Sequence, residues 1–172
     1  GFDAAAVAAA AASHTVVSLV ATALGRLLAH DPAAAGRFRT ILLGGGPIPA
    51  DLRARAEAVG ARVVTTYGMT ETGGGCAHDG HPLAGVAIDL APGTDEILVR
   101  GPVVLRGLRL PDRDALLDGD TFATGDVGAW AADGRLTVVD RIKDLIITGG
   151  VNVSPTRVED ALRAGDLADL DR

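Results

Sequence analysis

The sequence predicts an α/β fold in which a mostly parallel, doubly wound sheet is followed by a small antiparallel β-barrel. Between residues 15 and 72, short β-branched runs alternate with helix-like segments long enough to connect parallel strands. After Gly80 the strands become short and are separated by proline and glycine turns, as in hairpins or a small barrel. Hydrophobic residues make up 48% of the 172 residues and aromatic residues only 3%, so the core must consist of Ala, Val, Leu and Ile.

The first part of the chain contains the parallel pattern. Its helices are predicted from propensity and from leucines at helical spacing, and Pro49 and Gly60 mark the start and end of one of them. Asp31-Pro32 marks either a turn or the start of a further helix. The predicted order is helix 4–12, strand 15–20, helix 21–29, strand 39–43, helix 49–59 and a strand that begins at Arg62 and ends at Tyr67-Gly68.

The second part contains the hairpins. Asp133-Gly134 is typical of a hairpin turn, and the charged cluster from Asp140 to Lys143 separates two hydrophobic strands. We therefore expect three domains, over residues 1–80, 81–140 and 141–172. The predicted elements are strands 86–90, 96–100, 103–105 and 144–148, a hairpin over 130–139 and a helix over 155–164.

Charge, cysteine content and the length of the apolar runs argue against several classes of protein. The net charge is −6, whereas a nucleic-acid-binding surface is basic. Cys76 is the only cysteine, so no intrachain disulfide can form. The longest apolar run, residues 4–12, is shorter than the roughly 20 residues that a membrane span needs. We expect a cytoplasmic protein, and because the chain begins at Gly1 we expect further residues before it.

A cluster of small polar residues follows the strand that begins at Arg62. Thr70, Glu71 and Thr72 bring two hydroxyls and a carboxylate together, and three glycines follow. Oxygen ligands suit Mg²⁺, and hydroxyls suit phosphate, so the cluster is appropriate for the phosphate end of a nucleotide. Tyr67 offers a flat ring for stacking on a base. The alternative is a strand end followed by a helix N-cap with Glu71 in the first turn.

Three further segments offer nucleotide-binding groups, each with a simpler structural interpretation. Gly44-Gly45-Gly46-Pro47 allows close approach of a ligand to the backbone, or is a strand-to-helix turn. Asp126 in Thr124-Gly125-Asp126 has two oxygens for ribose hydroxyls, or is a solvated turn residue. Arg141 suits a phosphate or a ribose, or belongs to an ion-pair network.

Taken in order, five motifs resemble the adenylate-forming (AMP-binding) superfamily, which includes acyl-CoA synthetases, peptide-synthetase adenylation domains and luciferases. Within the acyl-CoA synthetase branch, residues 70–86 are most similar to o-succinylbenzoate–CoA ligases. The resemblance runs from about Thr15 to Leu162. The motifs are Gly-Gly-Gly-Pro (44–47), Tyr-Gly-Met-Thr-Glu-Thr (67–72), Thr-Gly-Asp (124–126), Val-Asp-Arg-Ile-Lys-Asp-Leu-Ile (139–146) and Gly-Gly-Val-Asn-Val-Ser-Pro-x-x-Val-Glu (149–159).

The resemblance implies an ATP- and Mg²⁺-dependent ligase that joins a carboxylic acid to a thiol, usually coenzyme A. An acyl-adenylate forms first, and the thiol then displaces AMP. A small C-terminal domain swings between the two half-reactions about a hinge, which falls at Lys143. Gly149-Gly150 is expected near the path of the thiol.

Other positions take roles from the same resemblance. Thr70 is expected at the α-phosphate and Glu71 at Mg²⁺, while Asp126 grips the ribose hydroxyls with Arg141 beside it. The residues expected around adenine are Gly45, Gly46, Pro47 and Tyr67, and Gly68 is also expected to bind the nucleotide. The residues expected to form the wall of the acyl pocket are Leu43, Gly73, Gly74 and Gly75.

Two motifs of the superfamily are missing. The phosphate loop ending in Pro-Lys-Gly is expected before residue 1, and the catalytic lysine is expected beyond residue 172. Lys143, in the hinge motif, is the only lysine of the chain, so we expect that the chain alone does not form adenylates. The alternatives are an adenylation domain that loads a carrier protein and a non-catalytic nucleotide-binding remnant. The sequence does not indicate an oligomeric state.

Overall fold

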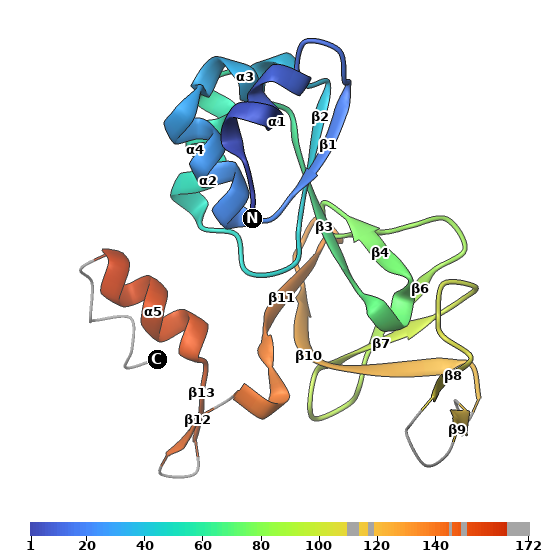
Figure 1. Ribbon diagram of the computed structural model, residues 1–172. Coiled ribbons are helices and arrows are strands. Elements are labelled where there is room, and N and C mark those ends of the chain that lie inside the picture. Colours follow the sequence, from blue (N-terminus) through green and yellow to red (C-terminus); the bar gives the residue numbers. More distant parts are fainter. Residues whose placement is uncertain (110–113, 117–118, 145, 149–150, 165–172) are drawn as a thin grey trace. The chain divides into compact units, whose positions relative to one another are not determined.

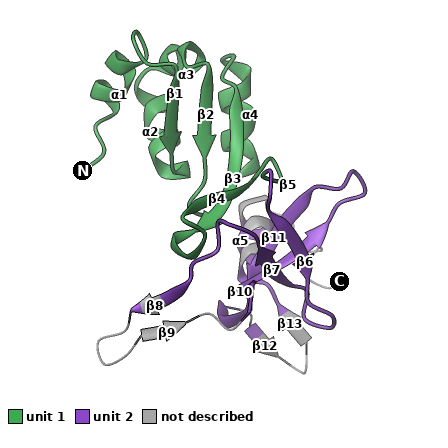
Figure 2. Cartoon of the chain, turned by 90° about the vertical axis from the view of Figure 1, so that its right-hand side faces the viewer, with its two compact units in different colours: residues 1–83 green, residues 84–172 purple. Residues whose placement is uncertain are grey.

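The computed structural model describes residues 1–109, 114–116, 119–144, 146–148 and 151–164, and the chain forms two compact units, residues 1–83 and 84–172 (Figure 2). The first unit combines helices with a mixed sheet, and the second consists mainly of antiparallel strands, so the predicted α/β class is confirmed. The predicted division after residue 80 lies close to the boundary between the units. The further division after residue 140 stays a prediction.

The sheet of the first unit has the strand order β1-β2-β3-β4-β5. Its first three strands are parallel, as predicted, and the last two continue the sheet with antiparallel pairs. The strands are β1 (Val16–Leu19), β2 (Thr40–Leu43), β3 (Val63–Met69), β4 (Gly74–His78) and β5 (His81–Pro82).

Four helices lie on one side of this sheet (Figure 1). Leucines at helical spacing in the second helix and alternating residues of the strands meet in one buried cluster, which includes Leu24, Leu27, Ile41 and Leu43 at 0% exposure. Alanine fills the space between the larger side chains, as the composition predicts. The helices are α1 (Ala4–Ala10), α2 (Ala21–His30), α3 (Pro32–Arg37) and α4 (Ala50–Ala58).

Asp31-Pro32 starts a helix, which decides between the two predicted alternatives. The Asp31 carboxylate accepts a hydrogen bond from the Ala34 amide at 3.2 Å, and Pro32 occupies the first turn, where its missing N–H is not needed. A hydrogen bond from Arg37 and the Ala34 amide together hold the pKa of Asp31 below its ordinary value. The chain therefore runs helix–helix between β1 and β2.

Strand β3 is longer than predicted. We expected it to end at Tyr67-Gly68, but it continues to Met69 because Gly68 and Met69 pair with Gly75 and Gly74 of β4. A β-carbon at Gly68 would lie within 3.0 Å of the backbone of Gly74, so the close approach of the two strands requires glycine. The polar cluster after β3 is thus flanked by a second strand.

The second unit contains a four-stranded antiparallel sheet in the order β11-β10-β7-β6, with Ile97 and Val99 of β7 fully buried. The turn predicted at Asp133-Gly134 connects β10 and β11, and the predicted last helix is present. Its elements are β6 (Ala87–Leu90), β7 (Glu96–Arg100), β8 (Gly107–Arg109), β9 (Asp114–Leu116), β10 (Thr121–Trp130), β11 (Leu136–Arg141), the 3₁₀ turn η2 (Ile142–Asp144), β12 (Ile146–Thr148), β13 (Val151–Val153) and α5 (Pro155–Ala164).

The strand predicted over residues 103–105 is wrong. The Val104 amide donates to the Gly101 carbonyl at 3.1 Å, which closes a turn with Pro102 in its second position. The next strand begins only at Gly107 and pairs with β9. Apolar β-branched residues therefore misled the prediction where a Gly-Pro pair determines the backbone.

No helix in the described part of the chain has both the length and the apolar character needed to cross a membrane.

Candidate functional site

The loop after β2 carries the glycines expected at adenine. Gly45 has φ +81°, which favours glycine, and Gly45, Gly46 and Pro47 are all exposed. Their backbone is therefore accessible to a ligand. Leu43 is fully buried in the helix-side core, so its predicted place in an acyl-pocket wall is not apparent from its packing.

The end of β3 presents the expected polar groups. Tyr67 and Gly68 lie in the strand, and Thr70 and Glu71 begin the 3₁₀ turn η1 (Thr70–Thr72). Thr70 is exposed and Glu71 is half-buried. Glu71 in the first turn of a short helical segment agrees with the simpler structural interpretation, but it leaves both side chains accessible.

Thr72 has a structural role that distinguishes it from Thr70. It is 3% exposed, and its hydroxyl accepts from the Met69 amide at 3.0 Å. The same hydroxyl lies 2.7 Å from the Gly74 carbonyl, to which it donates. A hydroxyl that bonds to the backbone before and after the turn fixes the conformation in which Thr70 and Glu71 are presented.

The three glycines expected in the acyl pocket have a backbone explanation. Gly73 ends η1 with φ +64°, and Gly74 enters β4 with φ +127°. Side chains are strained at such angles, so a tight return from η1 into β4 requires glycine whether or not a ligand binds there. Gly73, Gly74 and Gly75 are all exposed, and their role in an acyl pocket stays a prediction.

Asp79 holds β3 at Thr65, a contact that the sequence did not predict. Its Oδ1 accepts from the Thr65 amide at 2.9 Å and from the Thr65 hydroxyl at 3.2 Å, and its own amide donates to the Thr65 carbonyl. Asp79 and Gly80 have φ +46° and +78° in the two-residue turn between β4 and β5. Asp-Gly between His78 and His81 is a hairpin signal that was available in the sequence.

Substitution of Asp79 should loosen β3 just before Tyr67. Asp79→Gly keeps the turn but removes the acceptor for Thr65, and we expect a local loss of about 1–3 kcal/mol. Asp79→Asn tolerates positive φ and retains an acceptor oxygen, so it serves as the matched control with a smaller loss. Hydrogen exchange of the Thr65 amide measures the effect. Equal protection in both variants would contradict this role of Asp79.

Cys76 is the only thiol, and it lies fully buried in β4. Burial disfavours the thiolate and raises the pKa of Cys76 above its ordinary value of 9.0. The protonated thiol of Cys76 therefore contributes fully to the free energy of unfolding below pH 9, and this contribution is lost as the pH rises through the higher folded-state pKa. We expect alkylation by iodoacetamide at pH 8 to be at least about tenfold slower than in the unfolded chain. Equal rates would show that the thiol is accessible.

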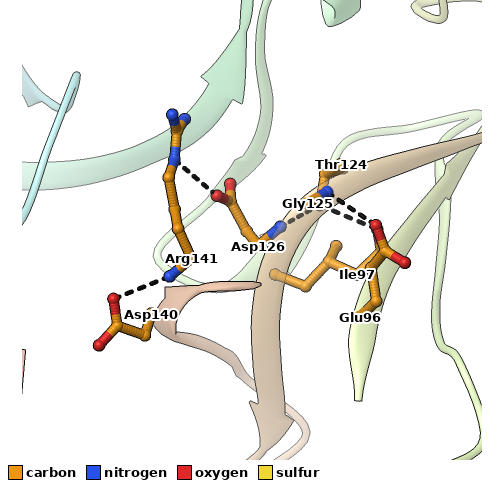
Figure 3. Close-up of polar contacts among 7 residues, drawn as sticks. All are labelled: Glu96, Ile97, Thr124, Gly125, Asp126, Asp140 and Arg141. Atoms are coloured by element: carbon orange, nitrogen blue, oxygen red, sulfur yellow. Dashed lines mark hydrogen bonds and ion pairs between the residues drawn. The ribbon is translucent and has the colours of Figure 1, made fainter. Parts of the chain in front are cut away.

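In the second unit, Asp126 and Arg141 are brought together (Figure 3). They pair across β10 and β11, and Arg141 Nε donates to Asp126 Oδ1 at 2.9 Å. The Asp126 side chain is 6% exposed and that of Arg141 is 51% exposed. The interpretation of Arg141 as part of an ion pair is therefore confirmed, and the pair directs the carboxylate of Asp126.

Lys143 is exposed in η2, between β11 and β12. Asp140 precedes this turn and Ser154 follows β13, and the Ser154 hydroxyl donates a hydrogen bond to the Asp140 carboxylate. The other oxygen of Asp140 accepts from the Arg141 amide at 2.8 Å. Lys143 thus lies in a short connection between β11 and β12, and its role as a hinge stays a prediction. Gly149-Gly150 lies outside the described residues.

Comparison with known proteins assigns these segments to a family. Residues 2–108 match the family described as AMP-binding enzyme, which covers more than half of the chain. The chain belongs to the AMP-binding enzyme family. The match includes the exposed loop after β2 and the polar turn after β3, the two segments in the first unit whose residues carry the resemblance.

Individual members of the AMP-binding family are similar over most of the chain. The probable 2-succinylbenzoate–CoA ligase of Mycobacterium tuberculosis is 42% identical over 151 residues, covering 84% of this chain and 39% of that protein. The structure of o-succinylbenzoate CoA synthetase (MenE) from Bacillus subtilis in complex with the acyl-adenylate intermediate OSB-AMP is 32% identical, with a TM-score of 0.83 over 95% of this chain and 39% of that one. The same synthetase in complex with ATP and magnesium ion is 29% identical, with a TM-score of 0.80 over 95% of this chain and 40% of that one.

The chain thus spans about two fifths of the length of these AMP-binding relatives.

Proposed function

We propose that this chain is part of an ATP-dependent acid–CoA ligase that converts o-succinylbenzoate to o-succinylbenzoyl-CoA in menaquinone biosynthesis. The observation that carries the proposal is the likeness, over 95% of the chain, to a synthetase bound to its acyl-adenylate. The identity of 42% to a 2-succinylbenzoate–CoA ligase supports the same substrate. The chain spans only part of these relatives, so the proposal concerns the complete protein.

The proposed reaction has two steps. The carboxylate oxygen of the acid attacks the α-phosphorus of ATP, an O–P bond forms, and pyrophosphate leaves. The deprotonated thiol of coenzyme A then attacks the acyl carbon, and AMP leaves with the electrons of the broken C–O bond. The first step requires that the protein orient ATP and the acid within contact distance, and the second requires the same of the acyl-adenylate and the thiol. In both, water must be kept from the activated acyl group.

Binding of adenine is proposed for residues of the first unit. The exposed backbone of Gly45, Gly46 and Pro47 and the ring of Tyr67 would bind the base, and Gly68 would also belong to the nucleotide site. A tyrosine ring stacks on a base without needing a particular hydrogen bond, and backbone groups then distinguish adenine from other bases.

The ribose and the α-phosphate would be bound by separate groups. Asp126, directed by Arg141, would accept from the ribose hydroxyls, because a carboxylate has two oxygens for two neighbouring donors. Thr70 would donate to the α-phosphate. These roles rest on position in the family motifs and on the accessibility of Thr70.

The residues after β3 fit Mg²⁺. Magnesium in nucleotide sites is held by one or two carboxylates together with phosphate oxygens and water, and does not need a cage of protein ligands. Glu71 supplies such a carboxylate, half-buried beside the exposed Thr70 hydroxyl. In the described part of the chain no three His, Cys, Asp or Glu side chains are grouped to hold a metal. When bound, the ion neutralises phosphate charge.

Three further assignments complete the proposal. Lys143 would be the hinge between the half-reactions, with Gly149-Gly150 near the path of the thiol. Leu43, Gly73, Gly74 and Gly75 would contribute to the acyl pocket. We also propose a cytoplasmic location.

The substrate is tested by thioester formation in the complete protein. CoA consumption is measured with o-succinylbenzoate, benzoate, succinate and malonate at equal concentrations, and kcat/KM is compared. We expect o-succinylbenzoate to exceed each of the others, since the pocket must recognise both its aromatic ring and its second carboxylate. A higher kcat/KM for another acid would overturn the substrate assignment and leave the reaction type in place.

A further inference from the structure

Asp126 lies in a bulge of β10. Ala123 pairs with Leu98 of β7 and Val127 pairs with Glu96, so residues 124–126 on one strand face only Ile97 on the other. A bulge interrupts the regular backbone pairing and redirects side chains, and such features recur beside functional sites. From this bulge the carboxylate of Asp126 accepts from Arg141 Nε at 2.9 Å (Figure 3).

Two side chains supply the hydrogen bonds that the regular ladder would have made. The Thr124 hydroxyl donates to the Ile97 carbonyl at 2.9 Å and accepts from the Asp126 amide at 3.1 Å. The amide of Gly125, which has φ +75°, donates to Glu96 Oε1 at 2.8 Å (Figure 3). A carboxylate acceptor makes this a charge-assisted bond, stronger than one between neutral groups.

We propose that Glu96 is a positioning residue for Asp126, and this inference rests on the proposed role of Asp126 at the ribose. Glu96 lies outside every motif that carries the family resemblance. It holds Gly125, the residue immediately before Asp126, and the Asp126 amide is itself held by Thr124. Loss of the Glu96 carboxylate leaves the Gly125 amide without its acceptor, and the bulge relaxes with Asp126 on it.

The test uses the complete protein and three variants. Glu96→Ala removes the acceptor, Glu96→Gln keeps an acceptor oxygen at the same reach, and Asp133→Ala removes an exposed carboxylate of the distant β10–β11 loop as a control. Acid-dependent exchange of pyrophosphate into ATP gives kcat and KM, with ATP and with 2′,3′-dideoxy-ATP. Hydrogen exchange of the Gly125 amide reports the bulge independently of activity.

We expect Glu96→Ala to raise KM for ATP by about tenfold, Glu96→Gln to raise it by less than about threefold, and Asp133→Ala to leave it unchanged. With 2′,3′-dideoxy-ATP, which lacks both hydroxyls, Glu96→Ala should have almost no further effect. Gly125 exchange should be faster in Glu96→Ala. Where that variant does not fold, Glu96→Asp, which retains the charge but shortens the reach, takes its place.

Each outcome separates the inference from the function on which it rests. An equal rise in KM for ATP and for 2′,3′-dideoxy-ATP would overturn the inference, because Glu96 would then support the fold in general. An unchanged KM in Glu96→Ala would overturn it as well. Wild-type protein that does not prefer ATP over 2′,3′-dideoxy-ATP would refute the role of Asp126, and with it the inference. Wild-type protein without acid-dependent exchange would refute the proposed function.

Discussion

Replacement of Glu71 by glutamine in the complete protein is expected to lower the rate of adenylation by about a hundredfold, since a metal ion contributes several kcal/mol of charge stabilisation. Glutamine has nearly the same size and keeps one oxygen, so the polar turn after β3 should be preserved. What is lost is the negative charge that attracts Mg²⁺ to the phosphates. The measurement is acid-dependent pyrophosphate exchange as a function of Mg²⁺ concentration.

A second glutamate, Glu57, provides the control for this prediction. Glu57 on α4 is also in the first unit and is paired with Arg53 at 2.8 Å on the exposed surface. Glu57→Gln should leave adenylation unchanged, because an exposed ion pair of this kind contributes little. We expect Glu71→Gln to require a higher Mg²⁺ concentration for half-maximal rate. An unchanged Mg²⁺ dependence would contradict the assignment of Glu71 to the metal.

Lys143→Pro should separate the two half-reactions. Proline fixes φ near −65° and removes the backbone N–H, so a hinge at this residue can no longer rotate. We expect adenylation within about twofold of wild type and thioester formation lower by about a hundredfold, the cost of small misplacement of reacting groups. Pyrophosphate exchange measures the first step, and CoA-dependent release of AMP measures the second.

Lys143→Ala is the matched variant, because it removes the charge without restricting the backbone. We expect Lys143→Ala to retain most of the thioester-forming rate that Lys143→Pro loses. If Lys143→Pro lowered both half-reactions equally, the hinge would have to lie elsewhere. If both variants lost the second step equally, the charge of Lys143 rather than its rotation would matter.

Hydrophobic patterning was sufficient for the elements that pack by themselves. The parallel strands β1, β2 and β3 follow from apolar and β-branched runs, and α2 follows from leucine spacing. Pro49 and Gly60 marked α4, whereas α3 was left open between a turn and a helix. By contrast, β4 consists largely of small residues, which allow a neighbouring strand to approach closely. No periodic hydrophobic signal therefore marks this strand in the sequence. The strand expected at residues 103–105 was wrong although its residues are apolar, because a turn that begins at Gly101-Pro102 determines the backbone there.

The residues proposed to contact the ligand lie in motifs that the sequence shows directly, whereas those proposed to position them do not. Glu71 and Asp126 belong to the family motifs. Asp79 and Glu96 act on residues 14 and 29 positions away, at Thr65 and Gly125. Their roles depend on the pairing of β3 with β4 and on the bulge between β7 and β10, and neither register can be read from local sequence.

We propose that the protein containing this chain activates a carboxylic acid through an acyl-adenylate. Exchange of radiolabelled pyrophosphate into ATP tests this claim when it is measured with the complete protein, Mg²⁺ and o-succinylbenzoate in the absence of CoA. We expect exchange that requires both the acid and Mg²⁺, and stoichiometric AMP only after CoA is added. Exchange that does not depend on any carboxylic acid, or no exchange while thioester still forms, would contradict the claim.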